Sequence, residues 1–574
     1  MGELLRLFTL ATSVFLACSP SDIPPKRQFR AVWVATFHNI DWPSTRGLSA
    51  EDQQEEFLSI LKSQKKNGMN ALVVQIRPCG DAFYQSQLAP WSEWITGVQG
   101  RAPEPFYDPL TFMVEETHKA NMEFHAWMNP FRAVSHQRFS SVDSSNLVNK
   151  KPEWFFQYGQ KTFFNPGEPA VRDYLTRVVV EVVKNYDVDG IHFDDYFYPY
   201  KEDGMPIPDQ KTFETYGGGF PDIESWRRNN IDLFVSQVSE AIRKEKSYVK
   251  FGISPLGIWR NKSVDPAGSN TRVSQTSYDA LYADVRKWLK LHWIDYVAPQ
   301  LYWATEHPSA SYSELLPWWA ENSFGRHVYI GHAMFKVKND QSRYWENPSQ
   351  LILQLKLNSA HPEVKGSIFY SANSFNGNPS HVEETLQNDF FHFPALIPAM
   401  TWKDSIPPLA PATLTAWEEG GKVILTWPQS ERAEDKELPR YYVVYRFSQD
   451  EKVNMNDATG ILALVKTTNF IDNTASSEKT YTYLVTAVDR LHNESRTCAA
   501  VIVKTLLADS GSVLPEVGES LDFHNAENLD ETLKKRLRKN VPFIAPLEFR
   551  TSHWLSQPIE PYKNSTLTSR GINR

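Results

Sequence analysis

The chain has 574 residues and a mass of 65.9 kDa. A single hydrophobic core stops growing at about 250–300 residues, so we expect two domains with additional segments. Apolar residues make up 41% and charged residues 22% of the sequence, which excludes a disordered chain. The net charge is −8 and no long Lys/Arg run occurs, which argues against nucleic acid as a partner.

The N-terminus carries an apolar run from Leu7 to Ala17, shorter than the roughly 20 residues that cross a bilayer. It is typical of a signal peptide. Cys18 directly follows Leu16 and Ala17, as in bacterial lipoprotein signals, so we predict a signal over residues 1–18 and a lipid anchor on Cys18 that attaches the protein to a membrane. The predicted location is the bacterial cell envelope, either on the outer membrane or in the periplasm. The alternative is an ordinary cleaved signal with an incidental cysteine.

Eight apolar runs of strand length follow, separated by stretches long enough for helices. Continuous rather than alternating hydrophobicity is typical of parallel strands buried on both faces. The runs are Phe29–Thr36, Asn70–Pro78, Met122–Pro130, Asp189–Pro199, Val249–Gly257, Ile294–Trp303, His327–Ala333 and Gly366–Ala372. This pattern predicts an α/β fold, a (β/α)₈ TIM barrel over residues 28–395. The alternative, a doubly wound open sheet, normally carries a Gly-rich phosphate loop, and the sequence has none.

Helix signals lie between these runs. Ser49 can cap a helix that extends to Lys66, with Asp52 three residues on as in a capping box, and Asn67-Gly68 ends it. Three further segments have similar signals: residues 169–185, 223–246 and 278–291.

After Pro394 the composition changes. Residues 396–412 are rich in proline and form a predicted linker. From 413 to 505 short alternating strands with polar turns predict an all-β sandwich. Its runs are KVILTW, RYYVVYRF, NFIDNT, TYTYLVTAVDR and CAAVIVK, and it resembles a fibronectin type III domain. The sequence assigns no role to a C-terminal tail over 506–574.

Polar and aromatic residues follow the predicted barrel strands. Barrel enzymes place their chemistry at the carboxyl ends of the strands, where the βα loops converge. Aromatic rings stack on the apolar faces of sugars, so these residues favour a glycan ligand. The predicted binding residues are His38, Arg77, Trp91, His125, Asn129, Arg132, His192, Tyr198, Gln300, Tyr302, Trp303 and Asn373.

Three acids are the candidate catalytic groups. Asp194 and Asp195 are the only adjacent acids at a strand end. Successive strand residues point to opposite faces, so we expect at most one of them to face the barrel axis. Glu93, between Trp91 and Trp94 in the long segment after the second strand, is the expected partner acid, since flanking apolar rings raise a carboxyl pKa. Glycoside hydrolysis requires two carboxyl groups of this kind. Glu123 stands at the opposite end of its strand.

A metal site is weakly indicated. His125, His192 and Asp194 lie near neighbouring strand ends, which leaves a mononuclear site conceivable. The sequence has no H-E-x-x-H motif and no Cys cluster, so we expect no catalytic metal and no cofactor.

Five motifs in order resemble the bacterial glycosyl hydrolase-like 10 family. They are FRAVWVATFHNIDWPS, VVQIRPCGDAFYQSQLAPWSEWITGVQG, HAWMNPFR, DGIHFDDYFYP and APQLYW. The resemblance implies a TIM-barrel glycoside hydrolase acting on an N-acetylhexosamine polymer, in particular peptidoglycan strands freed of peptide. Its acidic motif corresponds to Asp194 and Asp195, and its loop acid to Glu93. The alternatives are a catalytically silent glycan-binding lipoprotein and a hydrolase of another polysaccharide. The oligomeric state is not indicated.

Overall fold

The computed structural model describes residues 24–136, 142–337, 344–345, 349–506 and the backbone of 516–522. The predicted signal peptide, with Cys18, and most of the predicted tail lie outside these residues. No helix within the described ranges is long and apolar enough to cross a membrane.

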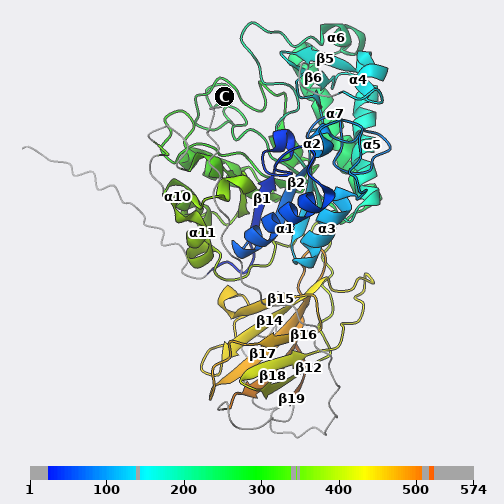
Figure 1. The fold of residues 1–574 in the computed structure, drawn as a ribbon. Coiled ribbons are helices and arrows are strands. Elements are labelled where there is room, and N and C mark those ends of the chain that lie inside the picture. The colour runs from blue at the N-terminus through cyan, green and yellow to red at the C-terminus, as the bar shows by residue number, and fades with distance from the viewer. Residues whose placement is uncertain (1–23, 137–141, 338–343, 346–348, 507–515, 523–574) are drawn as a thin grey trace, which may run out of the picture. The chain divides into compact units, whose positions relative to one another are not determined.

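Eight parallel strands close into a barrel in chain order, each hydrogen-bonded to its neighbours along the sequence, with the last strand paired to the first (Figure 1). The strands are β1 (Phe29–Val34), β2 (Ala71–Arg77), β3 (Glu123–Met128), β7 (Gly190–Phe193), β8 (Lys250–Ile253), β9 (Tyr296–Val297), β10 (His327–His332) and β11 (Val364–Phe369). Seven fall inside predicted runs and β11 begins two residues before the eighth run, so the predicted TIM barrel is confirmed.

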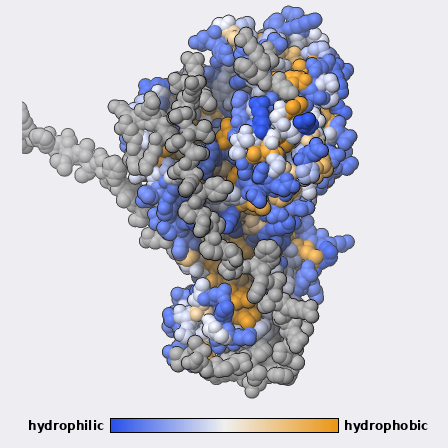
Figure 2. Space-filling model, in the orientation of Figure 1, coloured by the Kyte–Doolittle hydropathy of each residue, from blue (hydrophilic) through white to orange (hydrophobic). Residues whose placement is uncertain are grey.

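Helices surround the barrel and bury the outer faces of its strands. They are α1 (Ala50–Lys66), α2 (Glu93–Thr96), α3 (Pro109–Lys119), α4 (Leu147–Lys150), α5 (Pro169–Asn185), α6 (Gln210–Tyr216), α7 (Ile223–Glu245), α8 (Val285–Lys290), α9 (Tyr312–Glu321), α10 (Gln350–Ser359) and α11 (Val382–Thr385). Figure 2 shows hydrophilic residues over much of the face drawn, with smaller apolar patches between them.

The ends of α1 follow from its sequence. The Ser49 hydroxyl accepts a hydrogen bond from the Asp52 N–H, as predicted. Gly68 ends the helix region with φ +80°, and a Cβ there would stand 2.6 Å from the Cβ of Phe391. Glycine is therefore required both by backbone conformation and by space.

The predicted helix over 278–291 is too long. Only residues 285–290 are helical, as α8, and Asp284 caps them by accepting from the Lys287 N–H. Tyr282 has φ +55°, a left-handed conformation that an α-helix cannot contain.

A small antiparallel sheet is inserted after β3. It consists of β4 (Arg132–Val134), β6 (Lys161–Phe164) and β5 (Phe155–Tyr158), with β6 in the middle. The insertion follows directly from the end of a barrel strand, so it places Arg132 close to the rim of the barrel.

The C-terminal strands are antiparallel and form a β-sandwich. They are β12 (Thr413–Glu419), β13 (Lys422–Thr426), β14 (Tyr441–Ser448), β15 (Ile461–Val465), β16 (Asn469–Asp472), β17 (Thr480–Val488), β18 (Thr497–Lys504) and β19 (Glu516–Asp522). All five predicted strand runs are strands. β19 lies within the predicted tail, yet it pairs with both β12 and β18.

Candidate active site

Two carboxyl groups follow β7 at the carboxyl end of the barrel. The strand ends at Phe193, so Asp194 and Asp195 stand beyond it, and the strict alternation of strand side chains does not apply to them. Both are buried, with 4% and 5% of their surface exposed. Both bond to residues at the ends of other barrel strands. The expectation that at most one of the pair faces the barrel axis remains a prediction.

The end of β3 holds Asp194. Its Oδ2 accepts hydrogen bonds from Trp127 Nε1, at 3.2 Å, and from the amide of Asn129, and its Oδ1 accepts from the Tyr196 N–H at 3.4 Å. Burial raises the pKa of Asp194 to about 7, and the Asp195 carboxyl raises it in the same direction. Asp194 thus holds a proton into the neutral range, as a group that exchanges protons during a reaction must.

Asp195 has different partners. Tyr200 donates its hydroxyl hydrogen bond to Oδ2, and Gln300, beyond β9, donates to Oδ1 at 3.2 Å. Burial raises the pKa of Asp195, while the bonds from Tyr200 and Gln300 oppose that shift because they stabilise the charged form. The two neighbouring acids are therefore set in unlike environments.

A hydrogen-bond chain joins the ends of four consecutive strands. The N–H groups of Thr36 and Phe37, after β1, donate to Gln75 Oε1 at 3.0 and 2.8 Å. Gln75 Nε2 donates to Asn129 Oδ1 at 2.6 Å, and Asn129 donates to Asp194. Each amide in this chain has one orientation that satisfies both neighbours.

Glu93 begins α2 and is buried, with 2% of its surface exposed. Its Oε2 lies 3.1 Å from Arg46 Nη1. The Arg46 guanidinium lies 3.8 Å from the ring centre of Trp94, and Phe37 contacts Trp94 edge-on at 6.0 Å. Phe37 also donates to Gln75, so a series of contacts through Arg46, Trp94 and Phe37 connects Glu93 to the segment after β1.

Several predicted binding residues lie at this rim. Gln300 contacts Asp195 directly. His38 is exposed and stacks on Trp94 with ring centres 4.6 Å apart, and Asn373 is also exposed. The remaining rim aromatics are half-buried: Trp91, Tyr302 and Trp303.

Other predicted binding residues fill the interior instead. His125 and His192 both bond to the hydroxyl of Tyr296, at 2.8 and 3.0 Å. The second nitrogen of His125 contacts Glu123, and that of His192 contacts Ser254. Both rings are 0% exposed, so a role in sugar binding or metal binding does not fit them.

Two more predicted contacts are also buried. Tyr198 is 0% exposed and packs edge-on against Tyr282, with ring centres 5.0 Å apart. Arg77 is 1% exposed and donates to the Asp81 carbonyl at 3.4 Å. These positions differ from the predicted rim contacts because both side chains fill space between the barrel and its covering segments.

Asp41 and Tyr200 belong to the site and were not predicted. Asp41 accepts from the Ala35 N–H, from Ser371 Oγ and from the Asn373 N–H, at 2.6 to 2.7 Å, and so ties the ends of β1 and β11 together. Burial raises its pKa to about 6. Asp41 directly follows a predicted strand end and stands beside Trp42, and this pattern could have identified it in the sequence.

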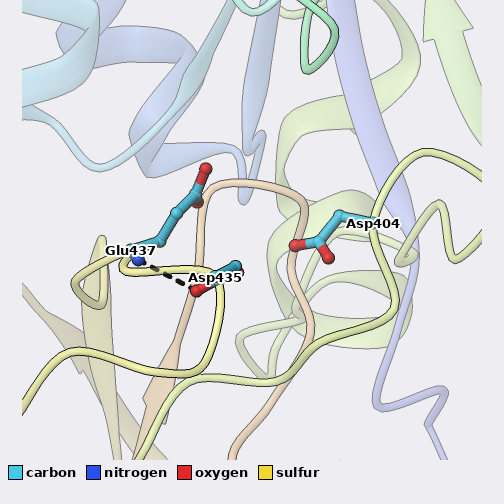
Figure 3. A group of neighbouring side chains, drawn as sticks. All are labelled: Asp404, Asp435 and Glu437. Carbon is cyan, nitrogen blue, oxygen red and sulfur yellow. Dashed lines mark hydrogen bonds between the residues drawn. The ribbon is translucent and has the colours of Figure 1, made fainter.

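One cluster of acids within the described residues has the spacing of a metal site. It consists of Asp404, Asp435 and Glu437, on two loops outside the barrel rim (Figure 3). The Glu437 N–H donates to Asp435 Oδ1 at 2.9 Å, so part of the cluster is a turn. Acidic side chains at a surface commonly gather without an ion, and this group is remote in sequence from every rim residue.

The comparisons with known proteins show the family of this chain. The family model "Glycosyl hydrolase-like 10" matches residues 28–347. Glycosyl hydrolase YngK of Bacillus subtilis (strain 168) is 43% identical over 86% of this chain and 96% of its own length. Glycosyl hydrolase DigH of Escherichia coli (strain K12) is 37% identical over 60% of this chain and 83% of its own. The glycoside hydrolase domain of PgaB (BpsB) from Bordetella bronchiseptica, a solved structure, is 12% identical with a TM-score of 0.41, covering 64% of this chain and 99% of that one.

Proposed function

The chain belongs to the glycosyl hydrolase-like 10 family, and we propose that it is an active glycoside hydrolase. Its proposed substrate is an N-acetylhexosamine-containing polymer, in particular peptidoglycan glycan strands that carry no peptide. The observation that carries the activity is the buried pair Asp194 and Asp195 at the barrel rim, where burial brings the pKa of Asp194 to about 7. The names of the two relatives, both glycosyl hydrolases, support the reaction class.

The proposed roles follow from the needs of the reaction. Glu93 protonates the leaving oxygen as the acid/base, and Asp194 or Asp195 acts as nucleophile or base on the opposite face of the sugar. Gln300 and Asn129 hold the acid pair through the hydrogen bonds described above.

We propose that rim side chains form the sugar subsites. His38, Trp91, Tyr302 and Trp303 offer partly exposed ring faces, on which sugar rings stack. Asn373, exposed after β11, offers a polar contact at the same rim.

A lipid anchor on Cys18 is part of the proposal, with the protein held in the cell envelope where such a glycan occurs. The sandwich, proposed as a fibronectin type III-type domain, follows the barrel in the same exported chain. A radioactive fatty acid fed to expressing cells should label the wild type and not Cys18→Ser. Equal labelling of both would exclude this anchor.

The reaction is tested with peptide-free peptidoglycan strands beside a panel of other polysaccharides, by measuring reducing ends and product masses. The wild type should release reducing ends, while Glu93→Gln and Asp195→Asn should lose at least about 10³-fold in kcat. Both variants should bind the strands within a few-fold of the wild-type affinity. If the wild type binds strands but releases no ends from any glycan, the chain is a binding protein and the catalytic proposal is wrong.

A further inference from the structure

We propose that Arg132 recognises a carboxylate on the sugar bound at this rim, so that the enzyme selects acidic over neutral glycans. The inference rests on the proposed function, since it concerns the same cleft. It adds one chemical feature of the substrate, a carboxylate, which the catalytic acids alone do not specify.

The first observation is the position of Arg132 between two aromatic rings. Its guanidinium carbon lies 4.4 Å from the ring centre of Phe37 and 4.4 Å from that of Tyr196, the residue after the acid pair. Rings on two sides leave only the edges of a planar guanidinium for hydrogen bonding. Its side chain is held in place by these contacts rather than by a bond to an acid.

The second observation is an unfilled hydrogen bond on this guanidinium. Arg132 is 5% exposed, yet within the described residues its guanidinium makes only a long hydrogen bond, from Nη1 to the Pro78 carbonyl at 3.5 Å. Its Nε is buried without a hydrogen-bond partner, and no ion pair joins it to an acid in the part of the chain that the structure describes. The Asp194 and Asp195 carboxyl groups stabilise the Arg132 charge from nearby, but the buried Nε–H still lacks an acceptor, which favours a ligand that supplies one.

The third observation is the concentration of positive charge nearby. Burial lowers the pKa of His38, and the charges of Arg46, Arg132 and Lys161 lower it further, so these cations lie close together. Lys161 begins β6, the strand that pairs with the one Arg132 begins. The charge of Glu202 acts on Lys161, but no carboxylate among the described residues lies within ion-pair distance of it. Arg46 is paired with Glu93, so the cationic patch that a ligand can use consists of Arg132 and Lys161.

The ligand chemistry follows from these three observations. A carboxylate is planar and matches the edge of a guanidinium. In peptidoglycan, the lactyl ether of every second sugar carries a free carboxylate only where the peptide has been removed. Arg132 would then distinguish a stripped strand from a peptide-bearing one, in which that carboxyl group is an uncharged amide. Uronic acids carry a carboxylate on the ring itself and are the other source of this chemistry.

The test compares four probes: peptide-free peptidoglycan strands, the same strands with their carboxylates amidated by methylamine, hyaluronan and chitin oligomers. The wild type, Arg132→Gln, Arg132→Lys and the control Arg101→Gln are assayed for kcat/KM. Arg101 is exposed in the segment between β2 and α3, and its substitution by glutamine removes the same charge. Thermal melting verifies that each variant is folded.

The wild type and Arg101→Gln should prefer the free-acid strands over the amidated strands by about 10- to 100-fold, the range for a hydrogen bond to a charged group. Arg132→Gln should cleave both at similar reduced rates, and Arg132→Lys should retain part of the preference. Faster cleavage of hyaluronan than of the free-acid strands would assign the patch to uronic acids. Equal wild-type rates on acid and amidated strands, or an unchanged preference in folded Arg132→Gln, would overturn the inference.

The wild type is compared on two probes that differ only in the carboxylate, so the inference is tested even if Arg132→Gln does not fold. If no probe is cleaved, the proposed function fails, and binding titrations decide the inference separately. The wild type should then bind the free-acid strands more tightly than the amidated ones by a similar factor. Equal affinities would contradict it.

Discussion

Gln75 determines which atom of Asn129 faces Asp194. The Gln75 Oε1 accepts from two backbone N–H groups, so its Nε2 is left to donate to Asn129 Oδ1, and the Asn129 amide nitrogen then turns to the carboxylate. A side chain that does not contact Asp194 thereby fixes the polarity of a group that does.

Gln75→Glu should reverse this polarity. A carboxylate at position 75 still accepts from Thr36 and Phe37 but cannot donate, so the Asn129 amide is expected to flip and present its oxygen to Asp194. We expect kcat to fall by about 10- to 100-fold, the scale of one misplaced hydrogen bond at a reacting group, with a smaller change in KM. Steady-state kinetics on the cleaved glycan measures both.

The matched control for this prediction is Gln53→Glu. Gln53 is 1% exposed, donates to the Leu48 carbonyl and accepts from Tyr107, but lies on α1 away from the rim. The Gln53→Glu variant introduces a similar buried charge, so it should lower the melting temperature without a comparable loss of kcat. Equal losses of kcat in both variants would show that the Gln75 effect is only one of stability.

Asp194→Asn should stabilise the protein near neutral pH. The Asp194 pKa is raised from 3.8 to about 7, so the folded state keeps a proton between these values that the unfolded state has released. Wild-type stability therefore falls as pH rises through this window, and the asparagine variant lacks that loss. We expect the free energy of unfolding of the variant, relative to the wild type, to increase by about 1–3 kcal/mol between pH 4.5 and 7.5. Urea unfolding at several pH values measures it.

Asp195→Asn provides the companion measurement. It removes the neighbouring carboxyl that raises the Asp194 pKa, so the decrease in stability over the same pH range should become smaller. A stability difference between Asp194→Asn and wild type that does not vary with pH would contradict the assignment of this proton.

Lys250→Met should strongly destabilise the barrel. Glu123 is buried, and its carboxylate accepts from Lys250, from His125 at 3.0 Å and from His492 of the sandwich at 2.6 Å. Burial alone would raise the Glu123 pKa, but Lys250 and His492 hold it well below its usual range. Removing the ammonium leaves a buried carboxylate poorly compensated, which costs about 3–5 kcal/mol.

Lys119→Met is the control for this change, since Lys119 is exposed and its ion pair with Glu116 lies at the surface. Its effect on the free energy of unfolding should be below about 0.5 kcal/mol. Thermal and urea unfolding of both variants give the comparison. Similar losses in the two would mean that the Glu123 cluster adds little to stability.

The barrel was predictable because hydrophobic runs of strand length report burial on both faces, a property of the strand itself. The acid pair was predictable for the same reason, as charged residues stand out directly after GIHF. The side-chain directions were not: His125 and His192 occur in strand runs like rim residues, yet Tyr296 from a distant strand holds both rings inside.

Long-range pairing limited the rest of the prediction. Asp41 acts through Ser371 and Asn373, which are more than 300 residues away, so no local pattern shows which strand ends it joins. Tyr282 interrupts the predicted helix over 278–291 through its left-handed backbone conformation alone. The role of Glu93 as acid/base is still a prediction, and so are the lipid anchor and the glycan specificity.

Strand β19 has a practical implication for how the protein can be shortened. It pairs with both β12 and β18, so a chain cut after residue 505 would expose one edge of each strand. Unpaired edges recruit strands from other molecules. A chain that ends at residue 505 is therefore expected to aggregate. A chain that ends beyond Asp522 keeps the edges of β12 and β18 paired with β19.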